Sequence, residues 1–216
     1  MEKKLYQFYY VIAFLALFSC QEDISNQETK NNQKEKFKTI EKIQIDSIRF
    51  IKKESAEMNK KGIQFIEDRN FTEAKKVFVK SLKIEPKNAI TFNNLALIAS
   101  NEGDFELANS YFKKSIYYDS SYFPAYINFS SFLIDNDYFK RSVAINDYIL
   151  KMNKDNEFEL MANYFNTYAY LAMKDCAKAS IYWIKSNKNS NLNKNIASSL
   201  IHLKSEIEKC QQNSSK

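Results

Sequence analysis

The feature of this 216-residue chain that most restricts its fold is a set of residues that recurs every 34 positions. The first set holds a small residue, an aromatic, an alanine, a second aromatic and a proline: Gly62, Phe65, Ala74, Phe78 and Pro86. The same shift from the first four positions gives a second set: Ala96, Ala99, Ala108 and Phe112. A period of about 20 to 50 residues is typical of repeat proteins, in which each unit buries its apolar face against its neighbours.

The composition favours helices for these repeats. The chain has two glycines and two prolines, far fewer than the average usage of about 7% and 5% would give. Sheet proteins need many turn glycines, so an all-helical chain with short connections is favoured. Aromatic residues make up 15% of the chain and supply large side chains for packing between helices.

The first set of residues resembles a tetratricopeptide repeat (TPR), a 34-residue unit of two helices joined by a turn. This resemblance implies an all-α fold, a right-handed superhelix (α-solenoid) of about four repeats with a C-terminal capping helix. We expect the repeats at residues 55–88, 89–122, 123–156 and 160–193, and the capping helix with a polar tail at residues 194–216. The capping helix shows a single apolar stripe, formed by Ile196, Leu200, Leu203 and Ile207.

Polar residues mark the turns inside the repeats. Asn70, Asp104 and Asp175 fit the N-cap position of a second helix, where a side-chain oxygen accepts a hydrogen bond from a free backbone N–H group. Gly103 stands where a tight turn is expected.

The third and fourth repeats depart from the pattern. Asn146 takes the place of the second aromatic, and we expect Ala144 and Tyr148 to supply the missing packing. The register continues only after a three-residue insertion within residues 153–159. The fourth repeat then has these residues at the repeat positions: Thr167, Tyr170, Ala179 and Trp183.

The N-terminus has the pattern of a secretory signal. Its apolar run, residues 5–18, follows two lysines and is shorter than the about 20 residues that span a bilayer. Residues 1–19, which end directly before Cys20, resemble a bacterial lipoprotein signal peptide. This resemblance implies that Cys20 is the lipidated first residue of the mature chain. An incidental cysteine is the alternative.

Two segments connect this signal to the repeats. Residues 20–36 are polar and predict a flexible tether. Residues 37–54 show apolar residues at helical spacing, so we expect an N-terminal extension helix that packs on the first repeat. A helix that binds a partner is the alternative for this segment.

The TPR resemblance also implies a binding site. In this family the first helix of each repeat lines a concave groove that receives a peptide or a helix of a partner protein. Carried over by position, the lining is Asn59, Ile63, Ile66, Asn93, Leu97, Ile127, Ser131, Tyr164 and Tyr168. An asparagine amide can bond a peptide backbone as donor and as acceptor, whereas packing against neighbouring helices is the alternative for several of these residues.

No set of residues predicts catalysis. His202 has no second histidine at metal spacing, so we expect no metal site of the His-Glu-x-x-His type. With two glycines no phosphate loop can be assembled, and we expect no cofactor, no small-molecule substrate and no enzyme activity. If the second helix of the fourth repeat and the capping helix run antiparallel, Cys176 and Cys210 lie at the same end of the pair. Either a disulfide or two unpaired thiols would then be possible.

The charge pattern limits the partners. The net charge is +6, and the lysines are scattered among acidic residues instead of gathered on one face, so nucleic acid is not an expected partner. We expect a membrane-anchored TPR scaffold that binds a protein partner in the bacterial cell envelope, exported and lipid-anchored to the outer membrane or cell surface rather than the inner membrane. One alternative is a surface lipoprotein that binds an anionic polymer through its lysines. Another is a thiol enzyme with a reactive Cys176.

Overall fold

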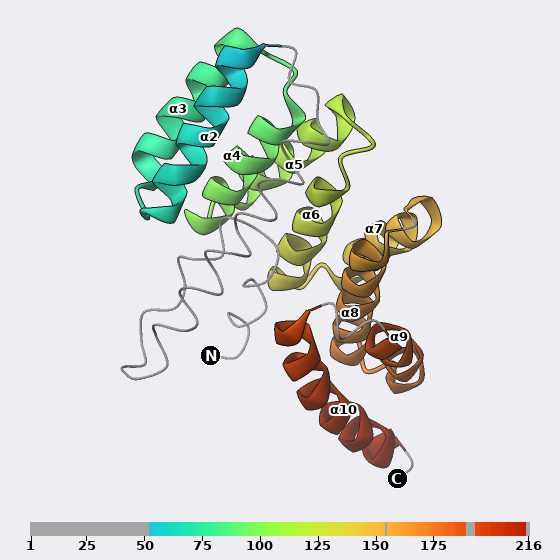
Figure 1. Ribbon diagram of the computed structural model, residues 1–216. Helices are drawn as coiled ribbons and strands as arrows, with labels where there is room; N and C mark the ends of the chain where they lie inside the picture. The colour runs from blue at the N-terminus through green and yellow to red at the C-terminus, as the bar shows by residue number, and fades with distance from the viewer. Residues whose placement is uncertain (1–51, 154, 189–192, 215–216) are drawn as a thin grey trace. The chain divides into compact units, whose positions relative to one another are not determined.

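The computed structural model describes residues 52–153, 155–188 and 193–214 (Figure 1). Within these ranges the regular structure consists of nine helices, labelled α2 to α10, and no strand. The expected signal peptide, Cys20, the tether and residues 37–51 of the extension helix lie outside the described residues. The described residues form two compact units that divide between Asp119 and Ser120.

The first unit contains two helical hairpins. Its helices are α2 (Lys53–Glu67), α3 (Phe71–Ile84), α4 (Ala89–Asn101) and α5 (Phe105–Tyr118). Each hairpin packs its own two helices together, and α3 and α2 also contact α4. The unit therefore holds the first two expected repeats.

The second unit contains two further hairpins and a last helix. Its helices are α6 (Phe123–Asp135), α7 (Phe139–Met152), α8 (Asn156–Ala172), α9 (Cys176–Lys188) and α10 (Lys194–Ser214). Helix α8 contacts α6 and α7 as well as its partner α9, and α10 packs against α9 and α8. The predicted fold class is confirmed, because the described chain is all-α and its helices pack in consecutive pairs as in TPR proteins.

The inserted residues before the fourth repeat mainly lengthen a helix. Helix α8 begins at Asn156 and has 17 residues, whereas the first helices of the second and third repeats, α4 and α6, each have 13. Asp155 caps α8, because its carboxylate accepts a hydrogen bond of 2.7 Å from the backbone N–H of Glu157.

The turn between the two helices of a repeat has the same backbone conformation four times. The last residue before each cap position has a positive φ: Arg69 (58°), Gly103 (78°), Asp137 (65°) and Lys174 (62°). This left-handed conformation favours glycine, yet glycine occupies it in the second repeat alone. The conformation therefore comes from the fold of the turn and not from the local sequence.

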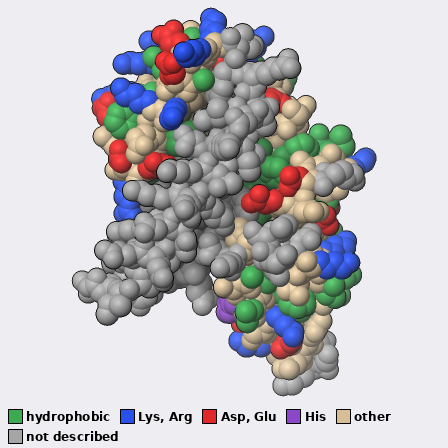
Figure 2. Space-filling model, in the orientation of Figure 1, with side chains coloured by type: hydrophobic (Ala, Val, Ile, Leu, Met, Phe, Trp, Pro, Cys, Tyr) green, Lys and Arg blue, Asp and Glu red, His purple; other side chains and the backbone are tan. Residues whose placement is uncertain are grey.

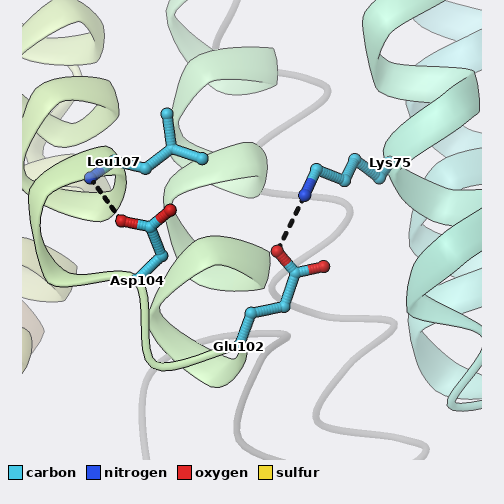
Figure 3. Close-up of polar contacts among 4 residues, drawn as sticks. All are labelled: Lys75, Glu102, Asp104 and Leu107. Atoms are coloured by element: carbon cyan, nitrogen blue, oxygen red, sulfur yellow. Dashed lines mark hydrogen bonds and ion pairs between the residues drawn. The ribbon is translucent and has the colours of Figure 1, made fainter.

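The predicted caps follow that turn. The side-chain oxygens of Asn70, Asp104 and Asp175 accept hydrogen bonds of 3.2, 3.1 and 3.1 Å from backbone N–H groups three residues later. Figure 3 shows the bond from the backbone of Leu107 to Asp104. The three cap predictions are confirmed. In the third repeat the cap position is Tyr138, which makes no such bond.

The core of the first unit explains the glycine of the repeat pattern. A Cβ atom at Gly62 would lie 2.5 Å from Cε1 of Phe78, well inside normal contact distance. The ring of Phe78 is fully buried and therefore packs directly on the backbone of α2. The buried cluster around it is Ile63, Ile66, Ala74, Phe78, Leu95 and Ile98.

The third repeat replaces this aromatic packing with hydrogen bonds. Asn146 is fully buried. Its Oδ1 accepts from Ser130 Oγ at 2.6 Å, and its Nδ2 donates to Asn166 Oδ1 at 2.9 Å. The prediction that Ala144 and Tyr148 supply the missing packing is wrong, since Ala144 is exposed and Tyr148 stacks on a tyrosine ring of α6 instead.

The apolar stripe predicted for the capping helix is confirmed. Its members face inward, with exposed fractions between 0 and 4%: Ile196, Leu200, Leu203 and Ile207. Among the helices that the structure describes, none combines the length and the apolar character that crossing a membrane requires.

Candidate functional site

Asn59, expected in the groove, is buried and makes its hydrogen bonds inside the first unit. It is 3% exposed. Its Nδ2 lies 2.8 Å from Ser81 Oγ and 3.0 Å from the carbonyl oxygen of Ser55, and its Oδ1 accepts from Thr91 Oγ1 at 3.0 Å. The amide thus joins α2, α3 and α4, and both of its ends are used. These bonds agree with the packing alternative for Asn59, and its place in the partner-binding groove stays a prediction.

The two isoleucines predicted beside it pack in the interior. Ile63 is 5% exposed and Ile66 is fully buried, and both belong to the cluster around Phe78. Their burial agrees with the packing alternative, and their place in the groove lining stays a prediction.

Helix α4 carries a buried amide donor, that of Asn94, beside two of the expected groove residues. Asn93 and Leu97, both expected in the groove, are 1% and 5% exposed. Asn93 Nδ2 donates to Asn94 Oδ1 at 3.5 Å, while Asn94 Nδ2 is buried and has no hydrogen-bond partner among the residues that the structure describes. Asn94 lies two residues from Ala96 and thus about 200° around the helix from it. It therefore shares the side of α4 that carries Leu97, three residues later.

The predicted set omitted Asn94. A signal for it was available, because Asn94 directly follows Asn93 in the helix that the resemblance assigns to the groove. A buried amide donor without a partner costs about 1 to 3 kcal/mol. Such a group is therefore a stronger pointer to a ligand than its hydrogen-bonded neighbour.

In the second unit, one predicted groove residue is accessible. Ile127, Ser131 and Tyr164 are buried, with exposed fractions of 1, 7 and 1%. The ring of Tyr164 tilts against Phe165, with the ring centroids 5.6 Å apart. Tyr168 is partly exposed, the one member of the predicted set that is not buried.

A hydrogen-bonded group links α7, α8 and α9 on the outer side of the fourth repeat. Asp147 Oδ1 accepts from Asn166 Nδ2 at 3.1 Å and from the Tyr182 hydroxyl at 3.3 Å. Partial burial, followed by the negative charge of Asp147, raises the pKa of Tyr182 to about 12. The phenol therefore stays protonated over the physiological range and acts as a fixed donor. This group was not predicted, because its members come from three helices.

Cys176 and Cys210 are joined by a disulfide, with their Cα atoms 5.8 Å apart. The bond links the start of α9 to the last turns of α10. Neither sulfur carries a free thiolate in this state, so the arrangement gives no support to a thiol enzyme.

His202 and the acidic residues form no metal site. His202 is exposed on α10, next to the buried Leu203. Within the part of the chain that the structure describes, no three His, Cys, Asp or Glu side chains come close enough together to hold an ion. The carboxylate of Glu206 has its pKa lowered chiefly by a hydrogen bond from Lys209, which is an ordinary surface pair.

Lysines of the first unit pair with nearby acids. Lys75 Nζ on α3 lies 2.7 Å from Glu102 at the end of α4, as Figure 3 shows. Lys76 forms a second pair with Glu73, one turn earlier on the same helix. In the space-filling view, basic and acidic side chains alternate over the region of α2 and α3 (Figure 2). This mixed surface gives an anionic polymer no continuous positive track.

Comparisons with known proteins support a TPR protein. Residues 89–122 match the sequence model of the family described as "Tetratricopeptide repeat". The solved structure titled "MamA RS-1 ArsTM double mutant", a TPR protein, is similar over 76% of this chain and 98% of its own, with a TM-score of 0.57 and 11% sequence identity. At this identity the likeness shows a shared fold. A search of curated protein sequences gave no match.

Proposed function

We propose that this chain is a membrane-anchored TPR scaffold of the bacterial cell envelope, which holds a peptide or helix of a partner protein against the first helices of its repeats. The TPR repeats and the TPR-type fold support a protein-interaction scaffold. The proposal adds the lipid on Cys20, the export of the chain, its outer-membrane or surface location, and the groove.

The observation that carries the groove is the amide of Asn94. Its buried Nδ2 has no partner, and on the same helix face lies the apolar side chain of Leu97. An extended peptide offers one carbonyl oxygen per residue, which is the acceptor that this donor lacks. Tyr168 on α8 supplies a partly exposed aromatic ring in the second unit.

Site-specific photo-cross-linking in intact cells tests the groove. A benzophenone side chain in place of Tyr168 should give an adduct with a protein partner. The matched control places the same group at Tyr117, which is 82% exposed on the second helix α5. Adducts of equal yield at both positions, or an adduct at Tyr117 alone, would overturn the groove assignment.

Asn94→Leu provides an independent readout. Leucine has similar size and no donor, so the cost of the unpaired N–H disappears in the free protein. The change also removes Oδ1, which accepts from Asn93 Nδ2 at 3.5 Å, so the gain in stability should stay below about 1 kcal/mol. Capture of the partner should fall in the same variant. A gain in stability without loss of capture would show that the amide does not contact the partner.

The anchor is tested separately. Mass analysis of the mature chain should find an acylated residue 20 as its first residue, and Cys20→Ala should move the protein out of the membrane fraction. An unmodified Cys20 in the membrane fraction would refute the lipid and leave the groove experiment unaffected.

A further inference from the structure

Helix α9 and the first half of α10 carry positive charge without negative charge. Between Cys176 and Ser205 the sequence contains no Asp or Glu, although the whole chain has 26. The same stretch holds five lysines: Lys178, Lys185, Lys188, Lys194 and Lys204. The nearest acids, Asp175 and Glu206, stand just outside and each pairs with a lysine, at 2.9 and 2.8 Å.

Three isoleucines are exposed on this pair of helices. Ile181 and Ile184 are 52% and 53% exposed, and Ile201 is 75% exposed. Ile181 and Ile184 lie three residues apart and thus share one side of α9. Single exposed apolar residues are normal on protein surfaces, but here three large ones occur within a stretch that has no carboxylate.

The seam between the two helices brings these isoleucines to one surface. Trp183 Nε1 donates to the carbonyl oxygen of Leu200 at 2.8 Å, and Lys204 Nζ lies 5.8 Å from the centre of the Trp183 ring. Ile201 is three residues from Lys204 and therefore lies on the side of α10 that faces this tryptophan. Ile184 directly follows Trp183 on α9. The Trp183 ring, which contacts α10, therefore lies near an exposed isoleucine of each helix, Ile184 and Ile201.

Aromatic rings also hold two of the lysines of α9. Lys178 Nζ lies 5.1 Å from the ring centre of Tyr170, and Lys185 Nζ lies 5.0 Å from that of Tyr182. The two tyrosine rings stack with their centroids 5.4 Å apart. These cations are therefore fixed at the edge of the isoleucine surface.

We propose that this surface, which we call the α9–α10 face (Ile181, Ile184, Ile201, Lys185, Lys188 and Lys204), binds an anionic phospholipid bilayer. Isoleucines that protrude can insert among acyl chains, Trp and Tyr prefer the boundary between headgroup and acyl layers, and lysines bind lipid phosphates. A second copy of the chain is disfavoured as the occupant, because two positive faces repel each other. The inference needs neither the groove nor a lipid on Cys20.

An acidic helix of another protein is the other anionic occupant. It would have to bury Ile201, which is more exposed than the two isoleucines of α9. A protein partner needs a matching pocket for a side chain that protrudes in this way, whereas a fluid bilayer adapts to it. The bilayer is therefore favoured.

Trp183 makes the test direct, because it is the one tryptophan of the chain. The full-length chain with Cys20→Ser, which cannot be acylated at that position, is mixed with vesicles of phosphatidylcholine that contain phosphatidylglycerol and acyl chains brominated near the glycerol. Bromine quenches tryptophan fluorescence at short range, so only membrane contact at the α9–α10 face reduces the signal. We expect quenching that weakens with added salt and is absent with vesicles of phosphatidylcholine alone.

The variant Ile181→Ser/Ile184→Ser/Ile201→Ser should lower the partition coefficient that is measured from this quenching by roughly tenfold or more, because each change removes inserted apolar surface. All three side chains are exposed, so circular dichroism should show an unchanged fold. The matched control, Val79→Ser/Met152→Ser, alters side chains that are 42% and 53% exposed elsewhere and should leave the quenching intact.

Three results would overturn the proposal. One is vesicle binding without quenching of Trp183, which would place the contact elsewhere in the chain. Another is equal quenching by anionic and neutral vesicles. The third is a change in Trp183 emission on addition of polyglutamate without any response to anionic vesicles, which would indicate an acidic protein partner.

Discussion

The substitution Gly62→Ala tests how closely α2 and α3 pack. In an exposed helix this change would stabilise the protein by about 0.5 to 1 kcal/mol, because glycine has the larger backbone entropy to lose. Here the new Cβ would lie 2.5, 2.6 and 2.9 Å from three carbons of the Phe78 ring. Carbon atoms in favourable contact are about 3.5 to 4.0 Å apart, so the ring has to move by about 1 Å.

The surroundings of Phe78 leave no room for that movement. The ring is fully buried, and Ile66, Leu95 and Ile98 around it are no more than 1% exposed. Overpacking a core of this kind costs about 1 to 3 kcal/mol, and three close carbons on a rigid ring place the cost at the upper end. After the gain in helix propensity, we expect a net loss of about 2 kcal/mol.

Urea unfolding followed by circular dichroism measures this loss as a lower midpoint. A second substitution, Phe78→Leu, removes the clashing carbons, so it should cost less in the Gly62→Ala background than in the parent chain. The coupling energy should be about 2 kcal/mol, within the range for residues in contact. As the control, Ile149→Val in the other compact unit should add to Gly62→Ala without coupling. A Gly62→Ala protein that is more stable than its parent would refute the packing argument.

Four further predictions concern single features of the structure. Gly103→Ala should cost about 1 kcal/mol in chemical unfolding, because the site has free space but a φ of 78°. Asn59→Ala should lower the free energy of unfolding by about 2 kcal/mol, since it removes the buried hydrogen bonds that the amide makes with Ser81 and Thr91. Removing the disulfide by Cys176→Ser/Cys210→Ser should lower the thermal stability by about 3 to 4 kcal/mol, as expected for a loop closed over a separation of 34 residues, and an unchanged melting temperature would contradict this. In the folded protein the pKa of Tyr182 is raised to about 12 from 10.0. The contribution of its hydroxyl to the free energy of unfolding should therefore be complete below pH 10.0 and disappear as the pH rises to about 12. Stability measured against pH should lack this loss in Tyr182→Phe.

Local spacing in the sequence predicted the turns well. Asn70 and Asp104 cap helices as expected, because a cap involves residues three positions apart and is visible in a short window. The sequence indicated the left-handed backbone conformation before the cap at one position, Gly103. At Arg69 and Asp137 the same conformation is imposed by the helices on both sides of the turn.

The hydrogen bonds of the expected groove residues could not be predicted, because position in a repeat does not reveal hydrogen-bond partners. Asn59 finds hydrogen-bond partners 22 and 32 residues away, on α3 and α4, and these bonds join three helices. Asn94 was the better indicator, yet only the structure shows that its amide donor is buried and unpaired. Whether a buried polar group has a hydrogen-bond partner depends on atoms from several helices. It therefore cannot be predicted from the sequence of one helix.

The sequence by itself determined the class of fold, since a 34-residue period, few turn residues and helical apolar spacing are sufficient to specify paired helices. The caps follow from the same local rules. Tertiary structure decided which side chains remain available, because burial and pairing depend on neighbours distant in the chain. The packing of Gly62 on Phe78, the buried Asn146, and the exposed isoleucines of α9 and α10 all became evident only when the helices were placed together.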